Sequence, residues 1–140
     1  MAREILFRGK RTDNGEWVTG SYLKANIHWH ERGIHEDWIA SLTIQNGGWC
    51  NVIGKYAVIH ETIGQYTGLT DKNGKKIFEG DIVWYEYQEE YGEIVYDEET
   101  AMFMVTFDSW CVEFDHYDAA KLEVVGRIHD KKLEDFENGC

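Results

Sequence analysis

The stretch GLTDKNGKKIFEGDIVWY, residues 68–85, decides the fold, because it joins a tight turn to the start of a strand. The step from Asp71 to Gly74 contains Asn and Gly, which supply the left-handed conformations that a tight return needs. The run 82–85 is rich in β-branched and aromatic residues, which favour strands. The carboxylates of Asp71 and Asp81 can accept hydrogen bonds from backbone N–H groups in the turns. We therefore interpret the stretch as a hairpin that leads into a strand, with charged residues that shape turns rather than perform chemistry.

Short apolar runs separated by turn residues fill the rest of the chain as well. The step Asp13-Asn14-Gly15 can take positive φ at its turn positions and predicts a hairpin between residues 4–9 and 16–23. The segment 52–61 is a further strand or, as the alternative, a single helical turn. Other strands are expected where β-prone residues run together or alternate with polar ones, at 38–44, 92–96, 102–107 and 122–128, with one helical turn at 117–122. The chain is therefore expected to be mainly β, with at most short helical turns.

Length, charge and cysteine usage limit what the chain can be. Its 140 residues suit one compact domain or two small lobes. The formal net charge of -12 repels phosphate backbones, so nucleic acid is not an expected partner. No membrane is expected either, because no run approaches the roughly 18 apolar residues of a membrane span. Three widely spaced cysteines, without a CxxC pair or a leader-like N-terminus, predict a reduced protein of the cytoplasm.

Closely spaced aromatic residues in the second half of the chain form the best candidate interaction surface. A small barrel alternates its side chains between an inner and an outer face, so some of these rings must face outward. Tyr and Trp bury large areas at low entropic cost, which suits a protein partner or a second copy of the chain. The alternative is that two lobes of the chain bury the rings against each other. The candidates are Trp84, Tyr85, Tyr87, Tyr91 and Trp110.

A metal site is a less favoured interpretation of the histidines near residue 30. His28 and His30 would share one face of a strand, and His35 follows a turn, so these three are the candidate ligands. Their spacing lacks the close Cys/His pairs of structural zinc sites. The acidic turns further along the chain lack the pattern of a calcium loop and are interpreted as a solvated rim. We therefore expect no bound metal.

Catalytic residues are not evident in the sequence. Glu79 and Asp81 are expected to be exposed beside Gly80, and an acid–base role would require burial to shift their pKa. Cys111 lies between apolar residues and is expected to pack as a small apolar side chain. Neither a G-x-S-x-G element nor a P-loop occurs. The sequence therefore predicts no enzyme, no catalytic residue and no cofactor.

Three stretches together resemble the YopX family of phage and prophage proteins: REILFRGKRTDNGEWVTGSYL at 3–23, IGQYTGLTDKNGKKIFEGDIV at 63–83 and EVVGRIHD at 123–130. The resemblance covers nearly the whole chain. It implies a C-terminal SH3-type small β-barrel with a charged tail at 62–140, and a β-rich N-terminal segment at 1–61 that helps to assemble oligomers. The family motif is expected to serve the fold through Tyr66, Gly68, Asp71, Gly74, Gly80 and Asp81.

These observations favour a non-enzymatic accessory protein of a phage or prophage, acting in the cytoplasm of the bacterial host cell. We expect it to bind protein, either a host or phage protein or further copies of itself as a homo-oligomer. One alternative is an acidic decoy whose carboxylates in residues 86–118, a segment without Lys or Arg, imitate DNA phosphates for a host nuclease or regulator. Two less favoured alternatives are a metal-dependent hydrolase that uses the three histidines, and a single-stranded nucleic-acid binder that uses Arg3, Arg8, Lys10 and Arg11.

Overall fold

The computed structural model describes residues 4–24, 37–44, 50–108 and 110–131. The chain divides into two compact units, Met1–Gln65 and Tyr66–Cys140. Residues 62–65, which the sequence assigns to the barrel domain, cluster with the N-terminal unit. Among the described residues, no helix has the length and apolarity needed to cross a membrane.

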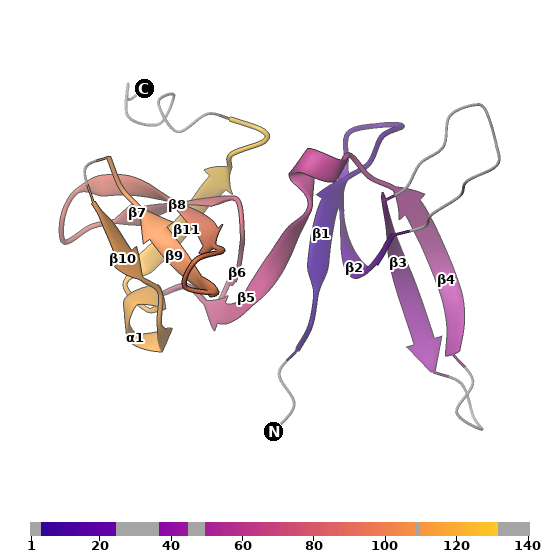
Figure 1. The fold of residues 1–140 in the computed structure, drawn as a ribbon, viewed down its shortest axis with the longest axis horizontal. Coiled ribbons are helices and arrows are strands. Elements are labelled where there is room, and N and C mark those ends of the chain that lie inside the picture. Colours follow the sequence, from indigo (N-terminus) through magenta and orange to yellow (C-terminus); the bar gives the residue numbers. More distant parts are fainter. Residues whose placement is uncertain (1–3, 25–36, 45–49, 109, 132–140) are drawn as a thin grey trace. The chain divides into compact units, whose positions relative to one another are not determined.

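The N-terminal unit is an antiparallel sheet that begins with the expected hairpin. Strands β1 (Phe7–Lys10) and β2 (Trp17–Lys24) pair across the turn, with Lys10 opposite Trp17 and Phe7 opposite Gly20. β3 (Asp37–Ile44) pairs with β2, and β4 (Cys50–Ala57) pairs with β3. The strand at 38–44 is thus confirmed, and the segment after it is a strand to residue 57, followed by the 3-10 turn η1 (His60–Thr62). The strand order is β4-β3-β2-β1-β5-β6 (Figure 1).

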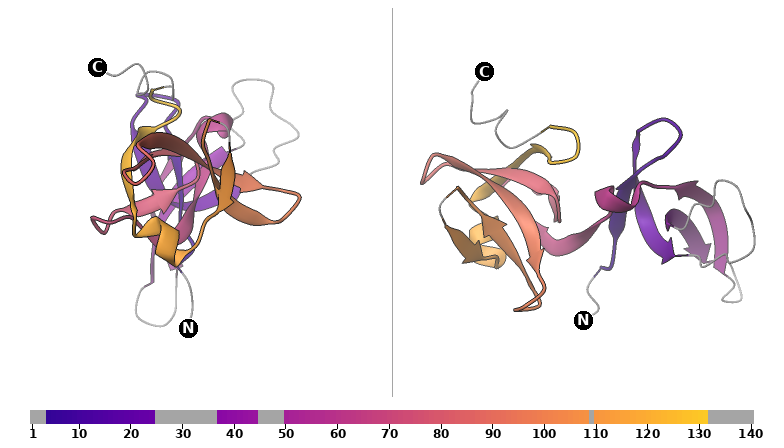
Figure 2. Two further views of the ribbon diagram at one scale, coloured as in Figure 1. Left: turned by 90° about the vertical axis from the view of Figure 1, so that its left-hand side faces the viewer. Right: turned by 45° about the horizontal axis from the view of Figure 1, so that its top comes forward.

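The strand β5 (Gly64–Thr70) continues from this sheet into the C-terminal unit, where it pairs with β6 (Lys76–Phe78). A meander of β7 (Asp81–Tyr85), β8 (Glu90–Asp97), β9 (Met102–Thr106) and β10 (Cys111–Glu113) follows. After the short helix α1 (His116–Ala119), β11 (Leu122–Arg127) returns to pair with β7 (Figure 2). The second sheet therefore has the order β10-β9-β8-β7-β11, and every pairing is antiparallel.

The prediction of a mainly β chain with short helical turns is confirmed, whereas the SH3-type barrel is not. Neither sheet closes on itself among the described strands, because β10 and β11 lie at opposite ends of the second sheet. Instead of closure, other elements cover its inner face: Ile77 from β6 and Ala119 from α1 pack with the core side chains of the sheet. The core consists of Ile77, Val83, Ile94, Val105, Phe107, Ala119, Leu122 and Val124.

Candidate functional site

Asp71 organises the turn between β5 and β6 through backbone hydrogen bonds. The residue is only 5% exposed, and its Oδ1 accepts hydrogen bonds from the N–H groups of Asn73 (2.8 Å) and Lys75 (2.9 Å). Its Oδ2 accepts a hydrogen bond from the N–H group of Val124 on β11, at 2.9 Å. One carboxylate therefore closes the turn and fixes it to a strand that lies far along the sequence.

Asp81 serves the turn between β6 and β7, and the expectation that it is exposed is wrong. It is 0% exposed, and its Oδ2 accepts a hydrogen bond from the N–H group of Phe78 at 2.7 Å. The turn is enclosed because Gly80 donates its N–H to the carbonyl of Ile94 and accepts a hydrogen bond from the N–H of Ile128, both at 2.8 Å. The carboxylate thus lies inside the unit and caps a backbone group.

The remaining motif residues also contribute to the hairpin geometry. Gly68, Gly74 and Gly80 have φ angles of +89°, +81° and +90°, a conformation that strains any residue with a Cβ atom. Tyr66 is buried, and its ring centroid lies 5.5 Å from that of Phe78. The motif residues of this stretch therefore serve turns and packing, and the carboxylates of Asp71 and Asp81 accept hydrogen bonds from the backbone.

The candidate aromatic surface divides between the two faces of the second sheet. Trp84 and Tyr85 follow one another on β7, so their side chains point to opposite faces. Trp84 pairs across the strands with Tyr91, with ring centroids 4.6 Å apart. Tyr85 packs instead against the core on the inner face. The five aromatic candidates therefore do not form one continuous surface.

Three of the five aromatic candidates, Tyr85, Tyr87 and Trp110, lie close together near the ends of strands on the inner face of the second sheet. We name these three residues the aromatic face. The ring centroid of Tyr85 lies 5.7 Å from that of Tyr87 and 6.0 Å from that of Phe107. Phe107 in turn stacks on Trp110, with centroids 4.3 Å apart and planes inclined by 17°. Tyr87 is 75% exposed and Trp110 38%, whereas Phe107 is buried beneath the indole.

A pocket with a volume of about 80 Å³ opens beside the aromatic face. The rings of Tyr85, Phe107 and Trp110 line it, together with apolar side chains from β9, β10 and β11. Among the described residues of the lining, Asp118 on α1 is the charged one. The indole is held in place at the mouth, because its Nε1–H donates to the carboxylate of Glu90 at 2.9 Å.

Asp118 has an electrostatic environment that disfavours its charge. Burial raises the pKa of the Asp118 carboxyl above its ordinary value, and the neighbouring carboxylate of Asp115 raises it further. Lys121 lowers the pKa, but its effect is smaller than these two. The pocket therefore combines aromatic walls with a carboxylate that would gain from a nearby cation.

A second polar cluster, in the N-terminal unit, was not anticipated from the sequence. The buried carboxylate of Asp37 accepts hydrogen bonds from the hydroxyl of Tyr22 and from Nδ1 of His60, the latter at 3.2 Å. Burial raises the pKa of Asp37, but the hydrogen bonds from Tyr22 and His60 outweigh it and leave the pKa below its ordinary value. The cluster joins β2, β3 and η1 and satisfies a buried charge. No spacing rule could have found it, because its members lie 15 and 23 residues apart in the sequence.

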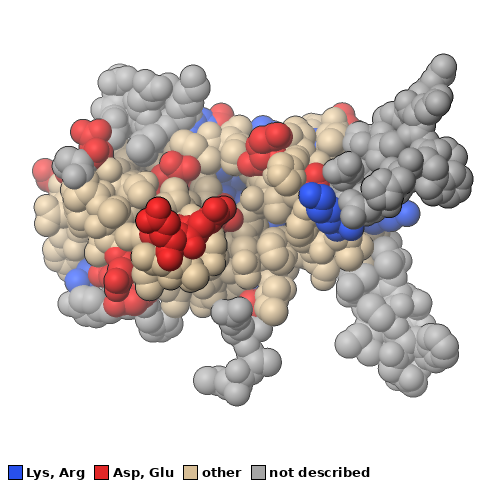
Figure 3. Space-filling model, viewed as in Figure 1, with Lys and Arg blue, Asp and Glu red and all other residues tan. Residues whose placement is uncertain are grey.

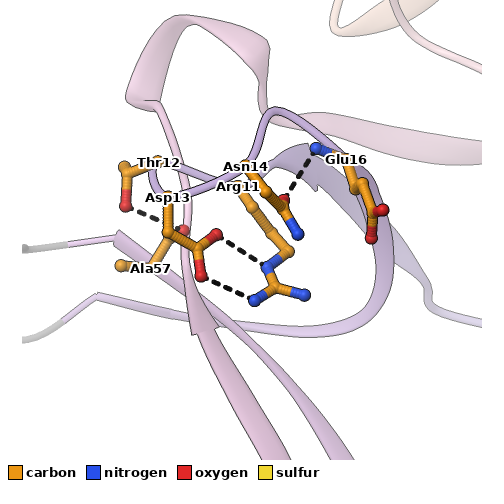
Figure 4. Close-up of polar contacts among 6 residues, drawn as sticks. All are labelled: Arg11, Thr12, Asp13, Asn14, Glu16 and Ala57. Carbon is orange, nitrogen blue, oxygen red and sulfur yellow. Dashed lines mark hydrogen bonds and ion pairs between the residues drawn. The ribbon is translucent and has the colours of Figure 1, made fainter.

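Basic residues near the N-terminus are engaged within their own unit. Arg11 forms a bidentate contact with Asp13, with Nε to Oδ1 at 2.9 Å and Nη2 to Oδ2 at 2.6 Å (Figure 4). The Arg11 guanidinium also lies 4.3 Å from the ring centroid of Tyr56. Arg8 is 4% exposed and lies 5.1 Å from the ring centroid of Trp17. Two of the four cations proposed for single-stranded nucleic acid are thus committed to internal contacts.

The histidine candidates for a metal site, His28, His30 and His35, lie outside the described residues, so that site stays a prediction. Among the residues that are described, no group of three or more His, Cys, Asp or Glu side chains is placed to hold a metal ion. The expectation that Cys111 packs as an apolar side chain is wrong. Its thiol is free and exposed, because alternation along β10 turns its neighbour Val112 inward instead.

The comparisons with known proteins agree with the fold. The family model described as YopX protein matches residues 6–133. The chain is also similar to a solved structure, the crystal structure of protein EF1440 from Enterococcus faecalis, with a TM-score of 0.56 and 23% sequence identity. That similarity covers 92% of this chain and 96% of the other, and at this identity it shows the fold alone. No curated protein matches the chain.

Proposed function

This chain belongs to the YopX family, and we propose that it is a protein-binding module that catalyses no reaction of its own. The observation that supports this proposal is the aromatic face, in which Tyr87 and Trp110 remain exposed while Tyr85 and Phe107 support them from the core. Exposed Tyr and Trp side chains that pack on other rings are favoured anchors of protein interfaces. The placement in a phage or prophage stays a prediction of the resemblance, and the placement in the cytoplasm stays a prediction from the cysteine usage.

The charge around the aromatic face favours a basic partner. Residues 86–118 contain eleven Asp and Glu residues and no Lys or Arg. Seven of these carboxylates are exposed, namely Glu86, Glu89, Glu98, Glu99, Asp108, Glu113 and Asp115. In the space-filling view, groups of acidic side chains lie over the C-terminal unit (Figure 3). Such a field attracts a positively charged protein and speeds its association.

The proposal can be tested by capture of proteins from a bacterial lysate with matched variants. Tyr87→Ser and Trp110→Ser remove the two exposed anchors, and Tyr96→Ser is the control because Tyr96 is 43% exposed on the same unit but outside the aromatic face. We expect a protein that is retained by the wild type and by Tyr96→Ser and lost with the other two variants. Equal capture by all four proteins, with unchanged melting curves, would contradict the proposal.

Self-association forms a further part of the proposal and requires a surface other than the aromatic face. A symmetric contact through that face would bring the carboxylates beside it, those of Glu86, Glu90 and Asp118, against those of another copy. The outer strand β4 offers an alternative, since edge strands present backbone groups for pairing. We expect light scattering to show an oligomer whose mass does not change in Tyr87→Ser. A strict monomer at all concentrations would contradict the proposal that the chain self-associates.

A DNA-mimicking decoy is the second candidate function, favoured by the same acidic segment. Its partner would be a nucleic-acid-binding protein whose basic surface accepts carboxylates in place of phosphates. The two functions differ in competition: double-stranded DNA would displace this chain from the partner of a decoy. A captured protein that stays bound in excess DNA would contradict the decoy function, and the protein-binding function would remain.

A further inference from the structure

The pocket beside the aromatic face has the size of a site for one side chain. Its volume of about 80 Å³ lies well below the roughly 300–1,000 Å³ found for small-molecule sites, so it suits a single side-chain head group rather than a whole small molecule. It is lined mainly by rings and apolar side chains, with one carboxylate, that of Asp118. This composition suits a side-chain head group that is flat and positively charged.

The aromatic walls provide the first half of that recognition. The faces of Trp and Tyr rings carry negative potential and attract cations placed within about 6 Å of the centroid. Trp110 is held by its stacking on Phe107 and by the hydrogen bond from its Nε1–H to Glu90, so its ring is ordered before any ligand arrives. The aromatic face already makes one contact of this kind, because Nζ of Lys121 lies 5.7 Å from the ring centroid of Tyr87.

The carboxylate of Asp118 provides the second half. Its charge is disfavoured by burial and by the nearby carboxylate of Asp115, and a cation in the pocket would relieve both effects. The segment from residue 86 to residue 118 has no Lys or Arg, and it contains Trp110, Glu113 and Asp115. Lys121, which lies over Tyr87, is one cation near the pocket, and a basic partner would supply a second.

We infer that this pocket binds the guanidinium group of an arginine presented by a basic protein partner, between the rings of Tyr85 and Trp110 and the carboxylate of Asp118. Guanidinium is preferred over ammonium because it is planar, stacks on aromatic faces and pairs with a carboxylate through two hydrogen bonds. The inference rests on the proposed function and names the chemical group that the aromatic face recognises.

The experiment is a titration of the full chain with N-acetyl-arginine amide, followed by NMR through the Trp110 Nε1–H and the backbone amides of β10. We expect saturable shifts confined to residues that line the pocket. N-acetyl-citrulline amide has nearly the same shape without the charge and should produce no saturable shift. N-acetyl-lysine amide, with its free ammonium group, should bind more weakly than the arginine compound.

Variants assign the contact to the carboxylate. Asp118→Asn keeps the size of the side chain and removes the charge, and should weaken the arginine compound about fivefold or more. Glu113→Gln removes an exposed carboxylate of β10 that is not part of the pocket lining, and should change the affinity less than about twofold, since exposed charges are screened. Equal binding of citrulline and arginine, or equal affinity in Asp118→Asn and the wild type, would overturn the inference.

The result also separates this inference from the proposed function. If the arginine compound does not bind, while capture of a protein partner still requires Tyr87 and Trp110, the guanidinium site is wrong and the binding module stands. If capture is also independent of both residues, the two proposals fail together. If the compound binds at the pocket but capture is independent of Tyr87 and Trp110, the guanidinium site stands and the proposed interface is wrong.

Discussion

Replacing Asp71 by alanine should destabilise the C-terminal unit by roughly 3 kcal/mol, because three backbone N–H groups lose their acceptor. The N–H group of Val124 is buried, and a buried donor without a partner costs roughly 1–3 kcal/mol. The N–H groups of Asn73 and Lys75 are partly buried and can reach water, so each costs less, roughly 0.5–1 kcal/mol. Asp71→Asn should cost nearly as much, since its amide group keeps only one acceptor oxygen and turns a donor towards a donor.

The assay is urea unfolding monitored by tryptophan fluorescence, with the slope of the transition checked for each variant. At a slope of about 2 kcal/mol per molar urea, the loss lowers the midpoint by about 1.5 M. Asp97→Ala is the matched control, because Asp97 accepts hydrogen bonds from the Glu99 N–H (3.2 Å) and the Thr100 hydroxyl (2.8 Å) in an exposed turn. That variant should lose less than about 1 kcal/mol.

Amide hydrogen exchange tests the same reasoning locally. In Asp71→Ala, the N–H of Val124 should exchange faster than in the wild type, whereas Asp97→Ala should leave it unchanged. Equal unfolding midpoints for Asp71→Ala and Asp97→Ala would refute the idea that losing the hydrogen bond between Asp71 and Val124 of β11 accounts for the loss of stability. Unchanged protection of Val124 in Asp71→Ala would refute the hydrogen bond itself.

Three further changes probe the core and the two perturbed carboxyls. Gly92→Ala should destabilise by about 1–3 kcal/mol in urea unfolding, because its Cβ would lie 3.0 Å from the Phe107 ring; a cost below 0.5 kcal/mol, on the order of an ordinary surface change, would contradict this packing. Burial raises the pKa of Glu93, so its ionisation costs stability as the pH rises; Glu93→Gln should therefore melt higher than the wild type at pH 7, with the difference vanishing below about pH 4. The pKa of Asp37 is lowered, because the hydrogen bonds from Tyr22 and His60 outweigh burial, so its contribution is present at neutral pH and lost as the pH falls. Asp37→Asn should accordingly melt lower at pH 7 and converge with the wild type in acid, and a difference that is independent of pH would exclude the charge as its cause.

Local features of the sequence predicted most of the secondary structure. Asn14-Gly15 identified the first hairpin, and alternation identified the strand from residue 38 to residue 44, because turn chemistry and side-chain alternation act within a few residues. Exposure was harder to predict. Asp81 was expected outside and lies inside, since the burial of a turn depends on whether other strands enclose it. The same reason applies to Cys111, whose orientation depends on which face of β10 meets the core.

The sequence by itself determined the family, the mainly β class and the turns of the hairpin between residues 66 and 81, because each rests on residues that are neighbours in the chain. Only the tertiary structure decided that Asp71 reaches Val124, and that Tyr85 joins Trp110 around a pocket while Trp84 turns away from it. These contacts depend on which strands pair and in which register. A one-residue change of register would move every side chain of a strand to the other face, and local sequence does not state which partner strand sets it.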